Sequence, residues 1–512
     1  MRTTLLRTTA TLFVLAALFA LPPAASAQTD VRRLTVEEAV RLALEHNLGV
    51  QVARLDPQIE DLAVAEAQAA WAPTFASTLQ GSSVDTPNAS FLSGALGPKT
   101  TDERINTNVG VAQTLPWGGN YSVGWDSSRA TTTNIFTNFS PVLRSSLALS
   151  YSQPLLRGFR IDAARQQLEV SRKSREVVDL TLRQSIALTA RAVRHAYWDL
   201  VFAIASLQVQ QQSLELARNS LKDTRARVEI GTTAPIDIVE AEAEVAQREE
   251  AAVVAEALIA TAEDALRALV YDPVAADFWT FRIEPSTPPG FAAPAVDLDA
   301  ALRTALANRS DLQRTQKDLE TADINLRYFR NQTLPDVTAS LDYGLTGLGG
   351  RQFIRGAGFP GPVIGNTDRG FADVIGDLFG NEFRSWTASL TIGYPIGPTP
   401  QEAGLARARL QYSRSQTALR SQQLQVAVEV RQAARQVLTD QRRVETTRVS
   451  RQLAERRLEA EQRKLAAGTT TSFFVFQAQR DLAQARNNEL RATLDYTRSV
   501  VDFETVQEAP LR

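Results

Sequence analysis

Residues 228–237 read VEIGTTAPID and residues 465–474 read LAAGTTTSFF, so a Gly-Thr-Thr triplet occurs at two matching places in the chain. Each triplet separates two long stretches that are rich in alanine and charged residues. Glycine commonly ends a helix, and Thr, Ser or Asp can cap the helix that follows. A short connection makes the two helices that it joins antiparallel. The sequence therefore predicts two helical hairpins with Gly231 and Gly468 at their tips.

The two triplets belong to an internal duplication. Two shifts align the halves of the chain: residues 34–47 with 296–309, and residues 193–203 with 430–440. Self-similarity at a fixed shift is typical of a repeated structural unit. We therefore predict two repeats, residues 28–295 and residues 296–512, that follow one plan.

Each repeat is expected to contain a very long helix. Residues 163–227 include no proline and no glycine, and at 1.5 Å per residue this is roughly 100 Å of continuous helix. Apolar residues recur at every seventh position from Ile186 to Val228, and the second repeat keeps this spacing with polar exceptions at Gln423 and Arg451. A sustained seven-residue repeat predicts helices that wind around one another as coiled coils.

Alternating stretches precede each long helix. Residues 336–346, 384–394 and 145–153 alternate aliphatic or aromatic residues with small polar ones. This period of two predicts strands with one apolar and one polar face. Such strands suit either a sheet packed on a core or a lipid-facing barrel wall. The long glycine-rich segments 84–106 and 345–383 favour the barrel, because loops of this length are uncommon inside compact domains.

Residues 107–129 predict an extra hairpin, with Pro116, Trp117, Gly118 and Gly119 between two alternating runs. The second repeat has no equivalent. The hairpin either extends the barrel wall or folds over its outer mouth, and the sequence does not choose. Without it, each chain supplies four strands, fewer than the eight or more that a membrane barrel needs. We therefore expect self-association, with a trimer giving twelve strands.

The N-terminal residues predict export. Arg2 and Arg7 flank an apolar run that ends at Leu21, and Ala25-Ser26-Ala27 follows. This pattern indicates a signal peptide, residues 1–27, that is removed. The alternative, a membrane anchor, is disfavoured because the run is too short to span a bilayer as a helix. The chain has no cysteine and a net charge of −2, so neither a disulfide framework nor a nucleic-acid partner is expected.

No catalytic arrangement is visible in the sequence. The two histidines, His46 and His195, lie far apart on helical stretches, and the chain has no phosphate loop, nucleophile elbow or H-E-x-x-H motif. Carboxylates on the helices alternate with Arg and Lys, as on a solvated face. We therefore expect no enzymatic activity, no cofactor and no metal site.

Taken together, these features resemble the TolC-like outer-membrane efflux proteins. The resemblance covers essentially the whole mature chain and is carried by four segments, LTVEEAVRLALEHN (34–47), QPLLRG (153–158), RVEIGTTAPIDIVEAEAEVAQ (227–247) and RKLAAGTTTSFFVFQAQRDLAQARNN (463–488). It implies a homotrimer in the outer membrane of a Gram-negative-type cell, with a twelve-strand barrel in the lipid and an α-barrel across the periplasm. It also implies a passive exit duct of a tripartite efflux or type I secretion system, joined by a periplasmic adaptor (membrane fusion protein) to an inner-membrane pump. Drugs, metals, siderophores and proteins all remain open as substrates.

The resemblance assigns roles at the hairpin tips. The residues that match turns in contact with the adaptor are Gly231, Thr232, Thr233, Gly468, Thr469 and Thr470. Asp237 matches a position that helps to hold the duct closed. In the second tip, Phe474 and Gln477 stand where family members such as TolC carry two acidic residues at the narrowest point, and Leu465 and Thr470 replace a tyrosine and an arginine that tie the closed tips together. An acidic, cation-binding constriction is therefore in doubt.

We hypothesise instead an uncharged or apolar gate around Phe473, Phe474 and Phe476. The alternative is that these phenylalanines simply pack the hairpin, because an apolar residue at helical spacing usually belongs to a core.

The predicted fold is therefore an internally duplicated α+β membrane protein. Long antiparallel coiled-coil hairpins would form a periplasmic α-barrel, and antiparallel strands would form a trimeric outer-membrane β-barrel. In the first repeat we expect, after an opening helix, strands at about 74–84 and 145–153, the extra hairpin 107–129, a long helix 162–228, a tip 229–236, a return helix 237–270 and an equatorial linker 271–295. In the second we expect a helix 297–332, strands at about 336–346 and 384–394, a long helix 401–466, a tip 467–473, a return helix 474–506 and a short tail.

The alternative function is an exported coiled-coil scaffold or adhesin-like stalk without a pore. Such a stalk would share the export signal and the heptads, but it would not need duplicated strand pairs with an apolar face.

Overall fold

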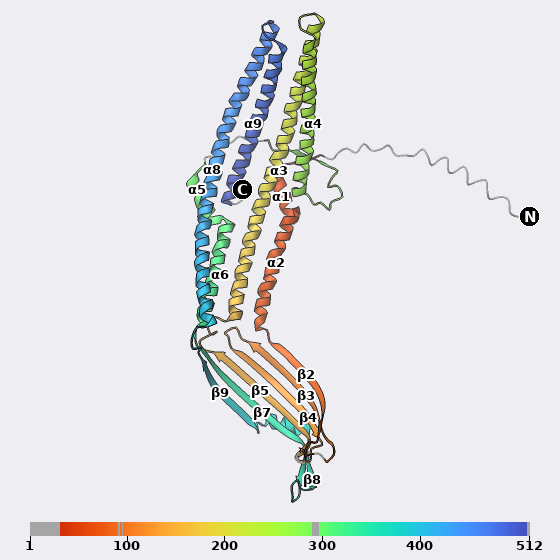
Figure 1. Ribbon diagram of the computed structural model, residues 1–512, viewed down its shortest axis with the longest axis vertical. Helices are drawn as coiled ribbons and strands as arrows, with labels where there is room; N and C mark the ends of the chain where they lie inside the picture. The colour runs from red at the N-terminus through yellow and green to blue at the C-terminus, as the bar shows by residue number, and fades with distance from the viewer. Residues whose placement is uncertain (1–30, 91–92, 95, 289–295, 509–512) are drawn as a thin grey trace, which may run out of the picture. The chain divides into compact units, whose positions relative to one another are not determined.

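The computed structural model describes residues 31–90, 93–94, 96–288 and 296–508 (Figure 1). The predicted signal peptide, residues 1–27, lies outside the described residues, as does the end of the predicted linker. The described residues form two compact units. Unit 1 is built from segments within 1–54, 182–310 and 424–512, and unit 2 from residues 55–181 and 311–423. Among the described helices, none is both long and apolar enough to cross a membrane.

The long helices and their return helices occur twice in the chain. The long helices are α3 (Ala163–Glu229) and α8 (Pro400–Ala466), each of 67 residues, and the return helices are α4 (Ile236–Val270) and α9 (Ser472–Gln507). The predicted bounds agree with these four helices to within two residues. The opening helices are α1 (Val36–His46) and α2 (Leu48–Gln68) in the first repeat, and α5 (Leu298–Asn308) and α6 (Ser310–Gln332) in the second. A short 3₁₀ turn, Ala69–Trp71, follows α2.

The expectation of a single helix over 297–332 is wrong, because Arg309 interrupts it, as Asn47 interrupts its counterpart. Both residues take ψ of 121°, outside the helical range. The Asn47 side chain accepts hydrogen bonds from the backbone N–H groups of Gly49 (3.0 Å) and Val50 (3.3 Å), and so caps the start of α2. A side chain that satisfies the free N–H groups of a helix start stabilises the break.

Unit 1 contains both hairpins and the core that holds their bases. Along the second hairpin, Val437, Val444 and Leu458 are buried at the predicted seven-residue spacing. At the base of the first hairpin, β1 (Val31–Leu34) pairs in parallel with β6 (Arg282–Pro285). Strand β6 lies within the segment 271–295 that was predicted to be a linker.

The two bases share a core pattern. Ala39 and Ala43 of α1 pack with Val193 of α3, and the equivalent residues Ala301, Ala305 and Val430 form the second cluster. Small residues at the same positions let an opening helix lie close to a long helix in each repeat.

Unit 2 contains one antiparallel sheet. Its strands are β2 (Thr74–Pro87), β3 (Lys99–Thr114), β4 (Asn120–Thr132), β5 (Phe139–Pro154), β7 (Asp336–Arg355), β8 (Val363–Arg369) and β9 (Arg384–Gly393). The order is β2-β3-β4-β5-β7, and β7 then pairs with β9 along its first part and with β8 along its last part (Figure 1).

The sheet therefore has more strands than the four counted without the hairpin 107–129. The extra hairpin 107–129 becomes β3 and β4, and it lies between β2 and β5 in the sheet. The predicted loops were also too long, because β7 extends to Arg355 and α7 (Phe371–Phe379) follows β8. Helix α7 packs on β7, where Val374 lies so close to Gly347 that a Cβ there would collide with its backbone.

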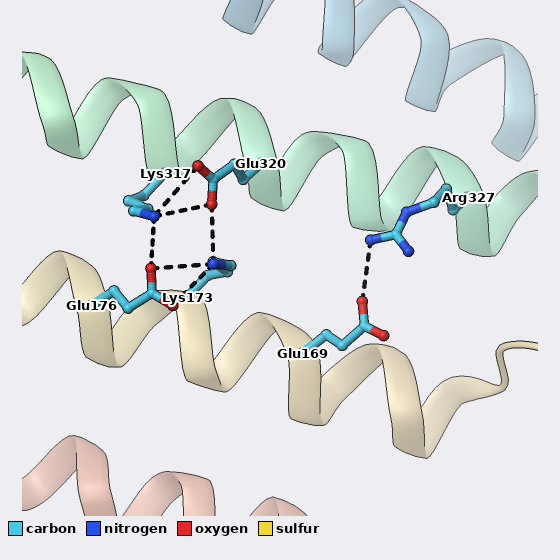
Figure 2. Close-up of polar contacts among 6 residues, drawn as sticks. All are labelled: Glu169, Lys173, Glu176, Lys317, Glu320 and Arg327. Atoms are coloured by element: carbon cyan, nitrogen blue, oxygen red, sulfur yellow. Dashed lines mark hydrogen bonds and ion pairs between the residues drawn. The ribbon is translucent and has the colours of Figure 1, made fainter. Parts of the chain in front are cut away.

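A network of charges joins α3 to α6 within unit 2 (Figure 2). Across the two helices, Lys317 lies 2.8 Å from Glu176 and Lys173 lies 3.0 Å from Glu320. Within each helix, Lys173 also pairs with Glu176 (2.9 Å) and Lys317 with Glu320 (3.2 Å). Every charge in this square thus has two opposite neighbours.

The network shifts the pKa values of its members. Hydrogen bonds from Lys317 and Lys173 hold the pKa of the Glu176 carboxyl below its ordinary value. Partial burial acts to raise the pKa of Glu320, but hydrogen bonds from the same two lysines outweigh it and the pKa is lowered. All four groups are therefore charged at neutral pH.

We predict that the double substitution Glu176→Gln/Glu320→Gln destabilises the folded protein at pH 7 and has a smaller effect at about pH 3. A carboxyl with a lowered folded pKa stabilises the fold above its unfolded pKa of about 4.3, and this contribution is lost as the pH falls through the folded value. Because the groups are partly exposed, the expected loss is on the order of 1 kcal/mol. Thermal unfolding followed by circular dichroism in detergent at both pH values measures it.

Glu66→Gln is the matched control, since Glu66 is an exposed carboxyl on α2. An equal loss of stability at pH 7 and pH 3 would contradict the electrostatic origin of the contact.

Candidate functional site at the hairpin tips

The two hairpins close with the same backbone geometry. Gly231 has φ of 77° and Gly468 has φ of 73°, in the left-handed region that favours glycine. The N–H of Thr232 donates to the carbonyl of Arg227 (2.9 Å), and the N–H of Thr469 donates to that of Lys464 (2.9 Å). A left-handed glycine, followed by a residue whose N–H donates back to a carbonyl of the last helical turn, is a common motif at the C-terminus of a helix.

The hydroxyls of the triplets strengthen these turns. Thr232 Oγ1 donates to the Arg227 carbonyl (3.0 Å), and Thr469 Oγ1 donates to the Lys464 carbonyl (3.1 Å). Thr470 Oγ1 reaches the Glu461 carboxylate at 3.4 Å, and Thr233 is half-buried. The repeated Gly-Thr-Thr is therefore explained by helix termination, and the first Thr of each triplet stays exposed.

The tips differ in what they expose. Beside the first tip, Ile230 and Ile236 are exposed. At the second tip, Phe473 is 51% and Phe474 49% exposed, and their rings meet edge to face with centroids 5.6 Å apart. Phe476, in contrast, is only 4% exposed. The phenylalanines thus divide into one that packs the hairpin and two that remain available to another surface.

The two polar candidates also differ in their surroundings. Asp237 lies in the first turn of α4, where the helix dipole favours a negative charge. The Gln477 amide donates to Asp481 (2.9 Å) and accepts a hydrogen bond from Arg480 (3.0 Å). Gln477 is therefore held in a polar network on α9.

The structure brings the two hairpins together near their tips. The Arg227 guanidinium of the first hairpin donates to the carbonyl of Leu465 in the second (3.3 Å). Further along, Arg480 of α9 lies 2.9 Å from the carboxylate of Glu244 on α4. Gln479 of α9 also donates to Ser220 of α3 (2.8 Å).

Glu244 is the residue that sequence reasoning missed. It is 4% exposed, and Arg248 holds its other side at 2.8 Å. A buried carboxylate is costly unless it is paired, and Arg480 and Arg248 supply its two partners. It lies on the same face of α4 as the buried Ala241 and Ala252. This helical spacing is the signal that could have identified it, because an acid on an apolar face requires a partner.

No cluster of three or more potential metal ligands occurs in the part of the chain that the structure describes. The surroundings of the tips are glycine turns, hydroxyls, exposed apolar side chains and paired charges. This arrangement suits contact with another protein or with a passing solute.

Comparison with known proteins shows which family and which solved structures the chain is similar to. The family model described as "Outer membrane efflux protein" matches residues 39–270 and 301–506, one range in each repeat. No curated protein sequence matches the chain.

Several solved structures share the fold. The CmeC outer membrane channel of Campylobacter jejuni is 14% identical with a TM-score of 0.64, and the alignment covers 92% of this chain and 85% of that chain. The VceC outer membrane protein of Vibrio cholerae is 15% identical with a TM-score of 0.61, covering 92% and 96%. The MtrE outer membrane channel of Neisseria gonorrhoeae, solved in an open state, is 16% identical with a TM-score of 0.60, covering 93% and 89%. At these identities the likeness concerns the fold alone.

Proposed function

Because this chain belongs to the outer membrane efflux protein family, whose model matches both of its repeats, we propose that three copies form the passive exit duct of a tripartite efflux or type I secretion system. The protein is located in the outer membrane and extends into the periplasm. A periplasmic adaptor would join the duct to an inner-membrane pump. The duct would act without catalysis, cofactor or resident metal.

The observation that carries this proposal is a contrast between equivalent helix surfaces. The duplication makes α2 equivalent to α6 and α3 equivalent to α8. Inside the chain, α3 packs on α6 through the charge network (Figure 2). The equivalent contact in the duplicated chain would join α8 to α2. Within one chain, however, α2 lies against α3, where the side chains of Asp61 and Arg175 are 2.6 Å apart. The α2 that completes α8 is therefore proposed to come from another copy.

The residues at this second contact suit an interface between copies. The shifts replace Lys173 and Glu176 by Leu410 and Ser413 on α8, and Lys317 and Glu320 by Leu55 and Gln58 on α2. In the single chain Leu410 is 74% and Leu55 is 53% exposed, and Ile59 and Leu62 continue the apolar stripe on α2. Exposed apolar stripes of this kind mark interaction sites.

The same contact favours a closed ring. An interface between two different surfaces of one chain is head-to-tail, and it generates a ring when the rotation closes. Three copies would set six repeats around a common axis, alternating the charged contact with the apolar one. A central passage follows from this arrangement.

We place the adaptor at the tips, on Gly231, Thr232, Thr233, Gly468, Thr469 and Thr470. The exposed Ile230 and Ile236 beside the first tip add apolar area for such a contact. Apolar area without excess charge is typical of the centre of a protein interface.

We place the gate at the second tip, with Phe473 and Phe474 as the apolar constriction. Hydrophobic constrictions gate channels by excluding water. Asp237 and Gln477 would contribute the polar edge of this site, and the Arg480–Glu244 pair would hold the two hairpins in the closed arrangement. Phe476 is assigned to packing because it is buried.

We predict that Leu410→Lys prevents trimer formation, because it places an uncompensated charge in an apolar contact, where burial costs several kcal/mol. Adding Gln58→Glu supplies the equivalent of the Lys173–Glu320 pair and should restore the trimer. Native mass spectrometry in detergent measures the assembly, and planar bilayers measure the current. At least a tenfold rise in trimer dissociation is expected for the single variant. A native chain that is monomeric and passes no current, as a stalk without a pore would be, contradicts the proposal.

We predict that Phe474→Ala raises single-channel conductance in planar bilayers, because it widens and hydrates an apolar constriction. Arg480→Ala should raise it too, by releasing α9 from Glu244. Phe476→Leu is the control, since its side chain packs inside the hairpin and should leave the current unchanged. An unaltered current in Phe474→Ala excludes the gate.

We predict that a photo-crosslinking residue at Thr232 or Thr469 captures a periplasmic adaptor in intact cells. The same residue at Glu250, exposed on α4 and away from the tip, is the control. Mass spectrometry identifies the captured protein. Equal capture at all three positions would refute a contact specific to the tips.

A further inference from the structure

We infer that the β3–β4 hairpin is part of the membrane wall, so that a trimer encloses eighteen strands, six from each chain, and not the twelve that the resemblance implies. This inference rests on the proposed trimer. It concerns the width of the channel within the membrane and the origin of its wall.

The backbone pairing places the hairpin inside the sheet. Strand β3 pairs with β2 from Thr74↔Ala112 to Pro87↔Lys99, and β4 pairs with β5 from Asn120↔Ser152 to Ala130↔Val142. β3 has 16 residues and β4 has 13, whereas about 9–11 residues span a bilayer as a strand. A hairpin folded over the mouth would leave β2 beside β5, and here β3 and β4 separate them.

The side chains of the hairpin continue the faces of their neighbours. One row of paired residues crosses all six long strands and is apolar throughout: Phe75, Val111, Val123, Leu149, Tyr343 and Trp386. The adjacent row, on the opposite face, has only small residues: Ala76, Gly110, Gly124, Ala148, Gly344 and Ser385. Membrane barrel strands alternate in this way between lipid and lumen.

The turn of the hairpin lies at the end of the sheet where the helices begin. Gly118, with φ of 91°, sits against Gly158 and Arg165 at the start of α3. Trp117 Nε1 donates to the hydroxyl of Tyr151 on β5 (3.4 Å). Aromatic side chains with polar tips are enriched at membrane–water interfaces, so the hairpin spans the full height of the wall.

The edges of the sheet suit closure by a second copy. In the described part of the chain, β2 is the outer strand on one side, and on the other side β9 is outer along the first part of β7 and β8 along its last part. The apolar residues Phe75, Leu79, Leu390 and Ile392 of β2 and β9 are exposed. Six is an even number, so β9 of one copy meets β2 of the next in antiparallel orientation. The duplication predicts how these two edges pair. Within the chain, the N–H of Leu155 at the end of β5 donates to the carbonyl of Val337 on β7 (2.7 Å). The equivalent residues in the other repeats are Ile392 on β9 and Phe75 on β2, so these two should pair between copies.

Eighteen strands would match the helical part of the duct. With strands about 4.8 Å apart and tilted by about 40°, eighteen strands give a backbone diameter of about 36 Å and twelve give about 24 Å. A ring of twelve helices, four from each copy, about 9 Å apart is about 34 Å wide. The wider wall therefore adds no constriction, and its inner row of Gly, Ala and Ser leaves the lumen open to bulky solutes.

The test is a scan of single cysteines, for which the cysteine-free chain is suited. A fluorescent label at Val109→Cys, Val111→Cys or Val123→Cys in vesicles should be quenched by brominated lipid, and a label at Asn108→Cys or Ser122→Cys by aqueous iodide, with at least a twofold contrast. Leu390→Cys and Ser389→Cys on β9 form the reference pair. If β9 alternates and the hairpin is reached only from water, the inference is overturned and the channel stands. If neither alternates, the proposed membrane wall itself fails.

A second measurement counts the strands. Ile392→Cys combined with Phe75→Cys, the pair that the two shifts place opposite each other, should give a disulfide-linked trimer on denaturing gels. Electron cryomicroscopy of that trimer should display eighteen strands in the wall. Twelve strands with a folded hairpin over the mouth would overturn the inference while leaving the trimer intact.

Discussion

The packing of one repeat on the next is the constraint on which the rest of the structure depends. A duplicated chain carries two copies of each helix surface, and only one of the two junctions can be made within a single chain. Here the internal junction is α3 on α6, held by Lys173, Glu176, Lys317 and Glu320. The other junction, α8 on α2, is left exposed with leucines at the equivalent positions. In the proposed trimer a second copy would complete this junction, and it would complete the edges of the sheet in the same way.

The tips follow from the same duplication and then depart from it. Both turns end with a left-handed glycine and a threonine that closes the last turn, so their backbone is determined by helix termination. Their flanking residues have diverged, since Asp237 in the first repeat corresponds to Phe474 in the second. The two tips are therefore alike in their backbone turns and different in the side chains beside them. The buried Glu244, paired with Arg480 from the other hairpin, then makes the relative position of the hairpins depend on a pair of charges.

Local patterns predicted the helices well, and pairing between distant segments was the main source of error. The bounds of α3 and α8 could be read because α3 contains no proline or glycine, because α8 contains them only near its start, at Pro400 and Gly404, and because both keep one seven-residue spacing. Alternation likewise identified the apolar face of β5, β7 and β9. It could not show that β3 lies beside β2, because period two specifies a face and not a neighbour. The break at Arg309 was missed since no proline or glycine marks it. The Glu244–Arg480 pair joins residues of different repeats, so no spacing along the chain reveals it.

The chemistry of the two junctions reflects how each is held. The α3–α6 contact joins two segments of one chain, so each segment is present at a high effective concentration near the other. Weak, partly exposed ion pairs are therefore enough to hold the two helices together. Such pairs discriminate against misaligned helices, because a slipped register sets like charges opposite one another. The proposed α8–α2 contact between copies would have to overcome the loss of translational and rotational freedom on association. Burial of apolar surface, at about 25 cal/mol per Å², is the contribution able to do so. One contact between repeats would then have been adapted for two tasks. The charged version aligns helices within a chain, and the leucine-lined version would assemble separate chains.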